Sequence, residues 1–178
     1  MIRAHSPLVG IAGWKKSGKT TLTTRLVEEF SRRGLTVATI KHAHHDFQID
    51  DAATDSARHR RAGAQQVAIV SSRRWALITE LGAAMEPDLE QVVAKLAPCD
   101  LILVEGYKSQ AIPKIEARRT AAFTSTPLAP DDPHVFAIAA DHVVSDAGGL
   151  PVFSLDDIGA IADLITATVL QTKFTSSR

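Results

Sequence analysis

An eight-residue segment near the start of the chain, G-W-K-K-S-G-K-T at residues 13–20, restricts the possible folds more than any other feature. It fits the spacing G-x-x-x-x-G-K-[ST] at every fixed position. An apolar run at residues 8–12 precedes it, and residues 20–33 follow with apolar side chains on one helical stripe that stops at Gly34. A strand, a glycine-containing loop and a helix in this order predict a phosphate-binding loop, here called the P-loop.

The chemistry of a P-loop gives its residues distinct expected roles. The glycines let backbone N–H groups wrap around phosphate, and the helix N-terminus adds a partial positive charge. Lys19 is expected to reach the β- and γ-phosphates as a catalytic residue, the Thr20 hydroxyl to ligate Mg²⁺, and Thr21 to lie at the α-phosphate. The predicted nucleotide-binding residues of this segment are Gly13, Lys15, Lys16, Ser17, Gly18, Lys19, Thr20 and Thr21.

A second candidate site segment follows the apolar run at residues 101–104, which is typical of a central strand in a parallel sheet. The run ends at Glu105, and P-loop proteins place an acid at such a strand end, oriented toward Mg²⁺. Glu105 is therefore a candidate metal ligand and catalytic residue, and Gly106 is expected to let the backbone approach the γ-phosphate. The alternative is that Glu105 only caps the strand end.

The remaining pattern predicts an α/β fold: a P-loop-type, mainly parallel sheet with helices on both faces. Further strands are expected at residues 36–41, 112–117, 135–139 and 151–153, and helices at residues 88–96, from Ser154 onward, and in a short basic stretch ending near Gly63. The runs at residues 67–70 and 75–79 predict an antiparallel hairpin that extends one edge of the sheet. We expect residues 1–178 to form one nucleotide-binding domain with a polar tail from about residue 171.

The composition indicates an ordinary globular protein with no global charge. Twenty Lys and Arg residues balance twenty Asp and Glu residues, so no field recruits nucleic acid or an anionic membrane. No apolar stretch approaches the roughly 18 residues of a membrane span, and the single cysteine, Cys99, allows no intramolecular disulfide. We therefore expect a soluble, cytoplasmic protein. The basic cluster at residues 58–61 lacks interleaved aromatic residues, so a solvated helix face or a contact with an anionic partner is expected rather than nucleic acid.

A polar stretch rich in histidine and aspartate follows the second expected strand. It includes His42, His44, His45, Asp46 and Asp50. Because it leaves the carboxyl end of a strand, where ligands collect in open α/β sheets, it is a candidate switch or substrate loop whose acids assist Mg²⁺. Two alternatives stay open, a solvated polar loop and a transition-metal site formed by the three histidines with Asp46.

Three segments together resemble one known family: GWKKSGKTTL, IKHAHHDFQIDDAATDSARHRRAGA and LVEGYKSQAIPKIE. Over about residues 7–170 they are similar to MobB, the molybdopterin-guanine dinucleotide biosynthesis adaptor family. The histidine-containing segment with D-S-x-R-H-R-x-A-G-A and the segment V-E-G-[FY]-K are much more specific than the P-loop, which many proteins share.

The resemblance implies a GTP-binding protein with weak GTPase activity, usually a homodimer. It would act beside the guanylyltransferase MobA, which attaches GMP to molybdopterin. The resemblance also implies that residues 13–21 bind phosphate and that Thr20 and Glu105 serve Mg²⁺. Acids around Asp46 and Asp50 would line the opening of the same phosphate site, with Asp50 as a further metal ligand. Lys108 would face the nucleotide or a pterin phosphate.

Two departures from the family pattern bear on these roles. The family usually has P-G-K-D-S where this chain has A-A-T-D-S at residues 52–56. Without that glycine and lysine, the loop has less backbone freedom and less positive charge. Related ATPases and GTPases often carry a lysine directly after the first P-loop glycine, where this chain has Trp14. Lys15 and Lys16 are then the available substitutes.

Other functions are compatible with a P-loop. A metallochaperone GTPase uses the same fold class and a histidine-bearing loop, but Cys99 has no partner cysteine and the chain has no histidine tail. A small-molecule kinase usually needs an arginine-rich lid, and the loop at residues 121–133 contains no arginine.

The sequence contains no N-K-x-D motif of the kind that binds guanine. Asp141 directly follows the expected strand at residues 135–140, at the ligand edge of the sheet. Its carboxylate is a candidate acceptor for the guanine N1–H and amino group. The alternative is that Asp141 caps a turn before His142.

Overall fold

The computed structural model describes residues 6–43, 47, 49, 54–124 and 126–171. The chain divides into two compact units, one formed by Met1–His42 and Leu96–Arg178, the other by Ala43–Lys95. Each unit is described by itself. In the described part of the chain, no helix is long and apolar enough to cross a membrane.

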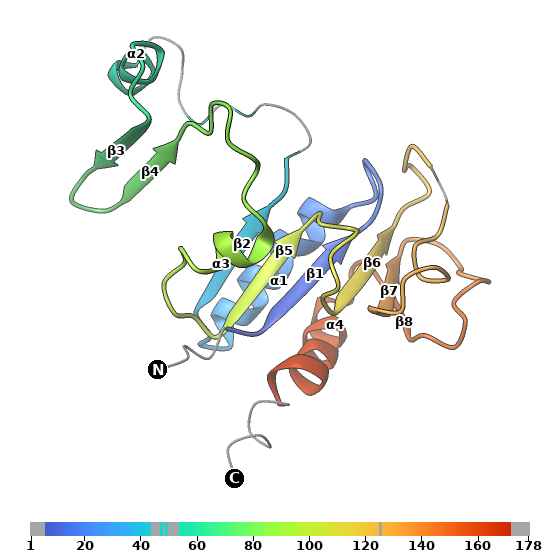
Figure 1. Ribbon diagram of the computed structural model, residues 1–178. Helices are drawn as coiled ribbons and strands as arrows, with labels where there is room; N and C mark the ends of the chain where they lie inside the picture. Colours follow the sequence, from blue (N-terminus) through green and yellow to red (C-terminus); the bar gives the residue numbers. More distant parts are fainter. Residues whose placement is uncertain (1–5, 44–46, 48, 50–53, 125, 172–178) are drawn as a thin grey trace. The chain divides into compact units, whose positions relative to one another are not determined.

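The first unit is built on a six-stranded sheet in the order β2-β5-β1-β6-β7-β8, in which all neighbouring strands are parallel (Figure 1). The strands are β1 (Leu8–Ala12), β2 (Val37–Lys41), β5 (Leu101–Glu105), β6 (Lys114–Arg118), β7 (Val135–Ala140) and β8 (Val152–Ser154). The helical elements are α1 (Lys19–Arg32), α4 (Ile158–Ile165) and the π-helical turn η1 (Thr166–Leu170). The predicted α/β fold with a parallel sheet is confirmed.

The core lies between one face of this sheet and the two α-helices. Leu22, Leu26 and Phe30 of α1 join Ile161 and Ile165 of α4 in one buried cluster with alternate residues of β1, β5, β6 and β7. The residues that alternate with them on β5 and β7 are also buried, namely Ile102, Val104 and Ile138. Both faces of the central strands are therefore covered, which is why their sequences are apolar without alternation.

The second unit contains α2 (Asp55–Arg61), β3 (Gln66–Val70), β4 (Trp75–Thr79) and α3 (Leu89–Val93). The predicted hairpin forms, with β3 and β4 antiparallel from Gln66↔Thr79 to Val70↔Trp75. It makes a two-stranded sheet of its own and does not extend an edge of the six-stranded sheet as expected. Sequence periodicity predicts which two runs pair across a short turn, but it carries no information about which further strand they meet.

The element ends shift for identifiable reasons. Strand β6 begins at Lys114 rather than residue 112, because Pro113 has no N–H to give to the ladder, although its carbonyl accepts from Gly10 N at 2.8 Å. Helix α4 begins at Ile158 with Asp157 as its N-cap, not Ser154, because Ser154 pairs with Ala140 in the sheet. Helix α3 is shorter than predicted, and its Asp88 forms a complete capping box with Gln91.

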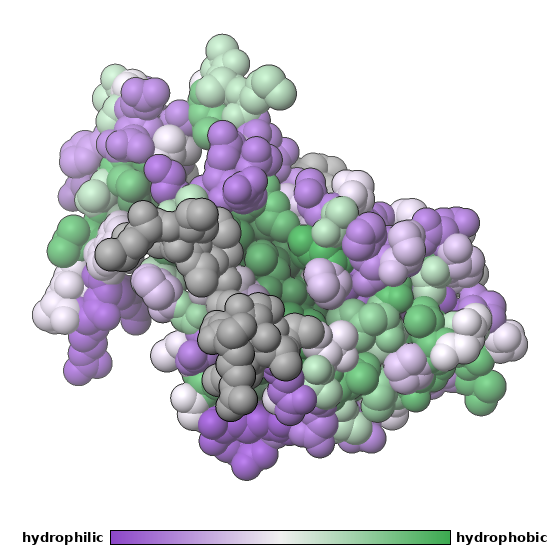
Figure 2. Space-filling view, turned by 60° about the horizontal axis from the view of Figure 1, so that its bottom comes forward, coloured by the Kyte–Doolittle hydropathy of each residue, from purple (hydrophilic) through white to green (hydrophobic). Residues whose placement is uncertain are grey.

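On the face shown in Figure 2, hydrophilic and hydrophobic residues are mixed. The twenty cationic and twenty anionic side chains of the chain leave no net charge. No global field therefore selects a strongly charged partner, and function has to be argued from local sites.

Candidate functional site

The P-loop connects β1 to α1 through a backbone that requires glycine. Gly13 has φ +142°, and a Cβ there would lie 2.5 Å from both the Ala117 carbonyl oxygen and the Ser17 Oγ. Gly18, the N-cap of α1, has φ +92°, and Lys16 adopts a left-handed φ of 65°. This sequence of conformations curls the loop over the start of α1, as phosphate binding by backbone N–H groups requires.

Lys19 lies where the P-loop motif predicts, at the first residue of α1. Its Nζ donates a hydrogen bond of 2.7 Å to the Trp14 carbonyl oxygen, across the mouth of the loop. Burial lowers the pKa of Lys19 below its ordinary value, and the nearby cations of Lys108 and Lys41 act in the same direction, while Glu105 opposes them. An anionic ligand would relieve the repulsion among these cations.

Glu105 and Thr20 come together although they are far apart in the chain. The Thr20 Oγ1 donates to Glu105 Oε1 at 2.7 Å, and Lys41 Nζ lies 3.5 Å from the same carboxylate oxygen. Glu105 is buried at the end of β5, whose register with β1 brings it beside Ile11. A hydroxyl and a carboxylate at hydrogen-bond distance are oxygen donors of the kind that Mg²⁺ uses with several waters, so the residues fit the ion.

The segment after β5 turns sharply back toward the P-loop. Gly106 has φ +94°, and a Cβ there would meet the His42 Cβ at 3.1 Å, so the strand ends of β5 and β2 approach closely. The ring centroids of His42 and Tyr107 are 4.6 Å apart. Lys108 Nζ then lies 3.5 Å from the centroid of the Trp14 ring, a cation–π contact. The residue that the family resemblance places at the nucleotide therefore does lie at the P-loop.

A buried lysine that the sequence analysis did not select supports this segment. Lys114 is 1% exposed, and its Nζ donates to the Lys108 carbonyl oxygen at 2.8 Å and to Asp132 Oδ2 at 2.6 Å. The lysine thus holds the backbone that presents Lys108. The sequence around Lys114 did not indicate that this lysine is buried and paired, because its partner Asp132 lies 18 residues further along the chain.

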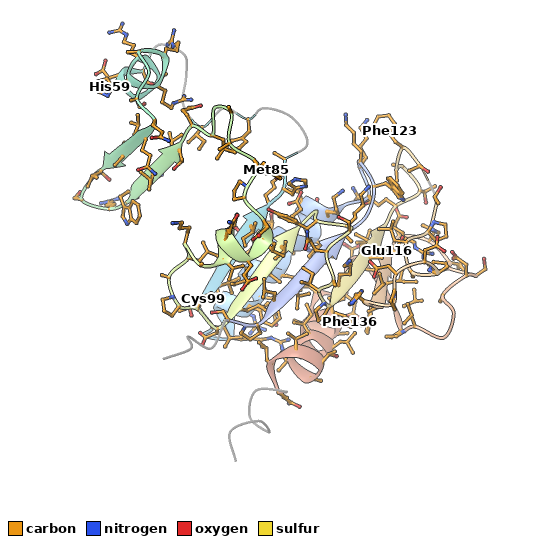
Figure 3. The ribbon with its side chains drawn as sticks, viewed as in Figure 1. His59, Met85, Cys99, Glu116, Phe123 and Phe136 are labelled. Carbon is orange, nitrogen blue, oxygen red and sulfur yellow. The ribbon has the colours of Figure 1, made fainter. Side chains whose placement is uncertain are left out.

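The loop after β6 contacts the P-loop from its other side. Phe123 donates its backbone N–H to the Lys15 carbonyl at 3.2 Å, and the Nζ atoms of Lys15 and Lys16 lie 5.4 and 4.9 Å from its ring centroid. The Trp14 Nε1 donates to the Thr126 carbonyl at 2.6 Å. Phe123 is nonetheless well exposed, and Figure 3 shows it at the tip of this loop. Sequence reasoning missed Phe123, since a single aromatic residue in a proline-rich loop has no periodic context.

A cavity of about 330 Å³ lies against the P-loop. It is lined by residues 16–21 together with Arg119 and Ala121. Its volume falls in the range of small-molecule sites, about 300–1,000 Å³. The predicted phosphate-binding residues from Lys16 to Thr21 are thus gathered around one hollow, with Arg119 as an additional cation that the sequence analysis did not select.

Asp141 directly follows β7, and its carboxylate is already engaged. Its Oδ1 accepts from the Thr120 N–H at 2.9 Å, from the Thr120 hydroxyl at 3.1 Å, and is 2.9 Å from His142 Nδ1. The hydrogen bond from His142, with those from Thr120, lowers the pKa of Asp141. This arrangement is that of a turn-capping residue, and a role in reading guanine stays a prediction.

Several predicted residues lie outside the described residues, namely His44, His45, Asp46 and Asp50. Among the residues that the structure does describe, no group of three or more His, Cys, Asp or Glu side chains is arranged to hold a metal ion. The assignments of a switch loop, a histidine metal site and Asp50 as a metal ligand therefore stay predictions.

Comparison with known proteins gives the family context. The family model described as "Molybdopterin guanine dinucleotide synthesis protein B", MobB, matches residues 8–141. The molybdopterin-guanine dinucleotide biosynthesis adapter protein of Escherichia coli is 36% identical over 161 residues, covering 89% of this chain and 91% of its own length. The adapter protein of the same name from Haemophilus influenzae is 37% identical, covering 89% of this chain and 87% of its own length.

Solved structures agree with the sequence comparison. The crystal structure of Bacillus subtilis MobB superposes with a TM-score of 0.72 at 25% identity, covering 92% of this chain and 98% of that one. A MobB homologue from Bacillus stearothermophilus gives a TM-score of 0.69 at 27% identity, covering 93% of this chain and 98% of its own. The fold, the P-loop geometry and the extent of these matches lead to one conclusion: the chain belongs to the MobB family.

Proposed function

We propose that this protein binds Mg·GTP at its P-loop and acts as an adapter in molybdopterin-guanine dinucleotide biosynthesis, with weak GTPase activity. The adapter role rests on the names of its relatives, which cover most of both chains. The nucleotide role rests on the site. The observation that carries it is the convergence of Lys19, Thr20 and Glu105 beside the cavity of the P-loop.

The geometry suggests how the residues divide the work. Lys19 would exchange its hydrogen bond to the Trp14 carbonyl for one to the β- and γ-phosphates, which compensates the burial of its charge. Thr20 and Glu105 would hold Mg²⁺, which when bound supplies positive charge to the phosphate oxygens. Arg119 and Lys16 line the same cavity and would neutralise further phosphate charge.

The partners follow from the same reasoning. An adapter of this family would deliver or stabilise a guanine nucleotide for MobA, the guanylyltransferase that joins GMP to molybdopterin. Exposed phosphate-site residues suit this role, because Lys15, Lys16 and Phe123 lie at the accessible rim of the P-loop. We further propose a homodimer, supported by large apolar side chains exposed on the β3–β4 hairpin.

Calorimetric titration with Mg·GTP tests the nucleotide site. Lys19→Ala should abolish measurable binding, because it removes the cation that the P-loop aims at the β- and γ-phosphates, while Lys95→Ala, an exposed lysine elsewhere, should bind as wild type. Glu105→Gln should bind GTP but lose most of the gain in affinity that Mg²⁺ confers. Near-normal Mg·GTP affinity in a folded Lys19→Ala protein would rule out the P-loop as the phosphate site.

A further inference from the structure

A second cavity adjoins the phosphate cavity. It has a volume of about 320 Å³ and lies at the carboxyl ends of β6 and β7. Ser17 and Arg119 line both cavities, so the two hollows share a wall at the P-loop. The side chains used below that line the second cavity are Ser17, Glu116, Arg118, His142 and Asp146. Because Ser17 and Arg119 line both, the two cavities are neighbours at the P-loop.

Two buried polar atoms on the wall of this cavity lack partners among the described residues. They are the Ser17 Oγ and the Arg118 Nε. Ser17 is 2% exposed, and the Arg118 side chain is 10% exposed. A buried donor or acceptor without a hydrogen bond is costly and uncommon in folded proteins, so an acceptor for Arg118 Nε and a partner for Ser17 are expected from a ligand.

The charged side chains of the cavity form a fixed network. Arg118 donates to Glu116 Oε2 at 2.8 Å and to Asp146 Oδ1 at 2.8 Å. Glu116 also accepts from the backbone N–H groups of Leu128 and Ala129 at 2.8 and 2.9 Å, and it is 1% exposed. Figure 3 labels Glu116 on β6. Both carboxylate oxygens of Glu116 are therefore engaged, and this residue fixes the position of Arg118.

Asp146 differs from Glu116, because its carboxylate can accept further hydrogen bonds. Its side chain is about half exposed and in the described structure only its Oδ1 is engaged, by Arg118. The other nearby carboxylate, Asp141, has its Oδ1 taken by Thr120 and His142 and its Oδ2 4.0 Å from Arg119 Nε, and it is not among the residues that line this cavity. A carboxylate oriented by an arginine on one side presents acceptor lone pairs on the other, and it has no hydrogen to donate.

We propose that the second cavity binds the guanine ring of the nucleotide whose phosphates occupy the P-loop, and that Asp146 accepts hydrogen bonds from its N1–H and 2-amino group. This inference rests on the proposed nucleotide function. Guanine presents two adjacent donors on this edge, which match two carboxylate acceptors, whereas adenine presents an acceptor at N1, which a carboxylate repels. Pterins present the same series of amino group, ring N–H and carbonyl, but the wall shared with the phosphate cavity favours a ring attached to phosphates.

Competition calorimetry with GTP, ITP, XTP and ATP tests the proposal in wild type, Asp146→Asn and a control, Asp163→Asn. Asp163 is an exposed aspartate in an equivalent 2.6 Å ion pair with Arg33, remote from the P-loop in the chain. Wild type should bind GTP about tenfold or more tightly than ITP, which lacks the 2-amino group, and tighter still than ATP. Asp146→Asn should lose about tenfold for GTP and gain relatively for XTP, whose 2-carbonyl accepts from the asparagine amide.

The outcomes separate this inference from the nucleotide function. If no triphosphate binds to wild type, the P-loop proposal itself fails. If GTP binds but the order of the four nucleotides is unchanged in Asp146→Asn, or changes equally in Asp163→Asn, Asp146 does not contact the base. Titration with 6-hydroxymethylpterin completes the test: competition at least a hundredfold weaker than GTP supports a nucleotide ring. Stoichiometric pterin binding beside saturating GTP would assign the cavity to a pterin and overturn the proposal.

Discussion

At the scale of single residues, the site depends on backbone conformations that few side chains tolerate. Gly13 combines a positive φ with close approach to the backbone of β6 and to Ser17. Lys16 and Tyr107 adopt left-handed conformations without being glycine. Such strained positions persist only when the surrounding contacts determine them, and here they flank the P-loop and the segment after Glu105.

The requirement for glycine at residue 13 can be measured directly. Gly13→Ala should lower the free energy of unfolding by about 2 kcal/mol or more, because its Cβ would overlap the Ala117 carbonyl as well as strain φ. Gly34→Ala is the matched control: its φ is +83° but nothing lies within 4 Å, so about 1 kcal/mol is expected. Urea denaturation of both variants makes the comparison. Equal losses would show that the close approach at Gly13 has no energetic consequence.

At the scale of elements, α1 serves both the core and the site. Its first residues, Lys19 and Thr20, face the phosphate cavity, while Leu22, Leu26 and Phe30 anchor it against the sheet. Its last turn is stabilised by charge: Glu29 accepts hydrogen bonds from Arg32 and Arg33, and Arg33 also pairs with Asp163 of α4. The helix that carries the P-loop cations is therefore tied at both ends.

The acid in that last turn gives a pH dependence with a definite sign. Hydrogen bonds from Arg32 and Arg33 lower the pKa of Glu29 from its ordinary value of 4.5 to about 2. A depressed pKa contributes stability that is present above pH 4.5 and is lost as the pH falls toward 2. The effect should be small and weakened by salt, because the ion pairs of Glu29 lie at the protein surface.

Thermal denaturation at pH 6 and pH 3.5 detects this contribution. Glu29→Gln should have a lower midpoint than wild type at pH 6, and the difference should shrink at pH 3.5 and in high salt. The control is Glu28→Gln, an exposed neighbour on α1. A difference between wild type and Glu29→Gln that is independent of pH would exclude the ion pairs as its cause.

At the scale of the whole molecule, the two compact units differ in how they use apolar residues. The first unit encloses a continuous core around a parallel sheet. The second exposes large apolar side chains on its hairpin, with Val70 at 75% and Trp75 at 71% exposure. Exposed apolar surface of this kind marks protein–protein contact, and a two-stranded sheet alone is only marginally stable in water.

In the proposed homodimer, a second copy of the chain covers this apolar surface of the hairpin. Trp75→Lys should shift the protein from dimer to monomer, because it puts a charge into the contact, as measured by size-exclusion chromatography with light scattering. Val143→Lys, at a residue 94% exposed in the first unit, should leave the mass unchanged. A Trp75→Lys protein that is still a dimer at low micromolar concentration would place the contact elsewhere.

What the sequence determined by itself was local or followed from a rule about sheet edges. The motif at residues 13–20 predicts the P-loop, the start of the following helix and the position of Lys19. All three are predicted together because the residues of the motif are neighbours in the chain. Glu105 was predicted although its partner Thr20 is 85 residues away, because parallel strands end at the same edge. Lys108 was predicted through family resemblance alone.

Only the tertiary structure decided which side chains that are distant in the sequence contact one another. Arg118 meets Asp146 across 28 residues, Trp14 reaches Thr126 across 112, and Lys114 is buried against Asp132. None of these pairs follows a helical or strand period, since each depends on the order β1-β6-β7 and on the path of loops between strands. The hairpin shows the same limit: the pairing of β3 with β4 is local in the sequence, whereas the absence, among the described residues, of a further strand beside them is not.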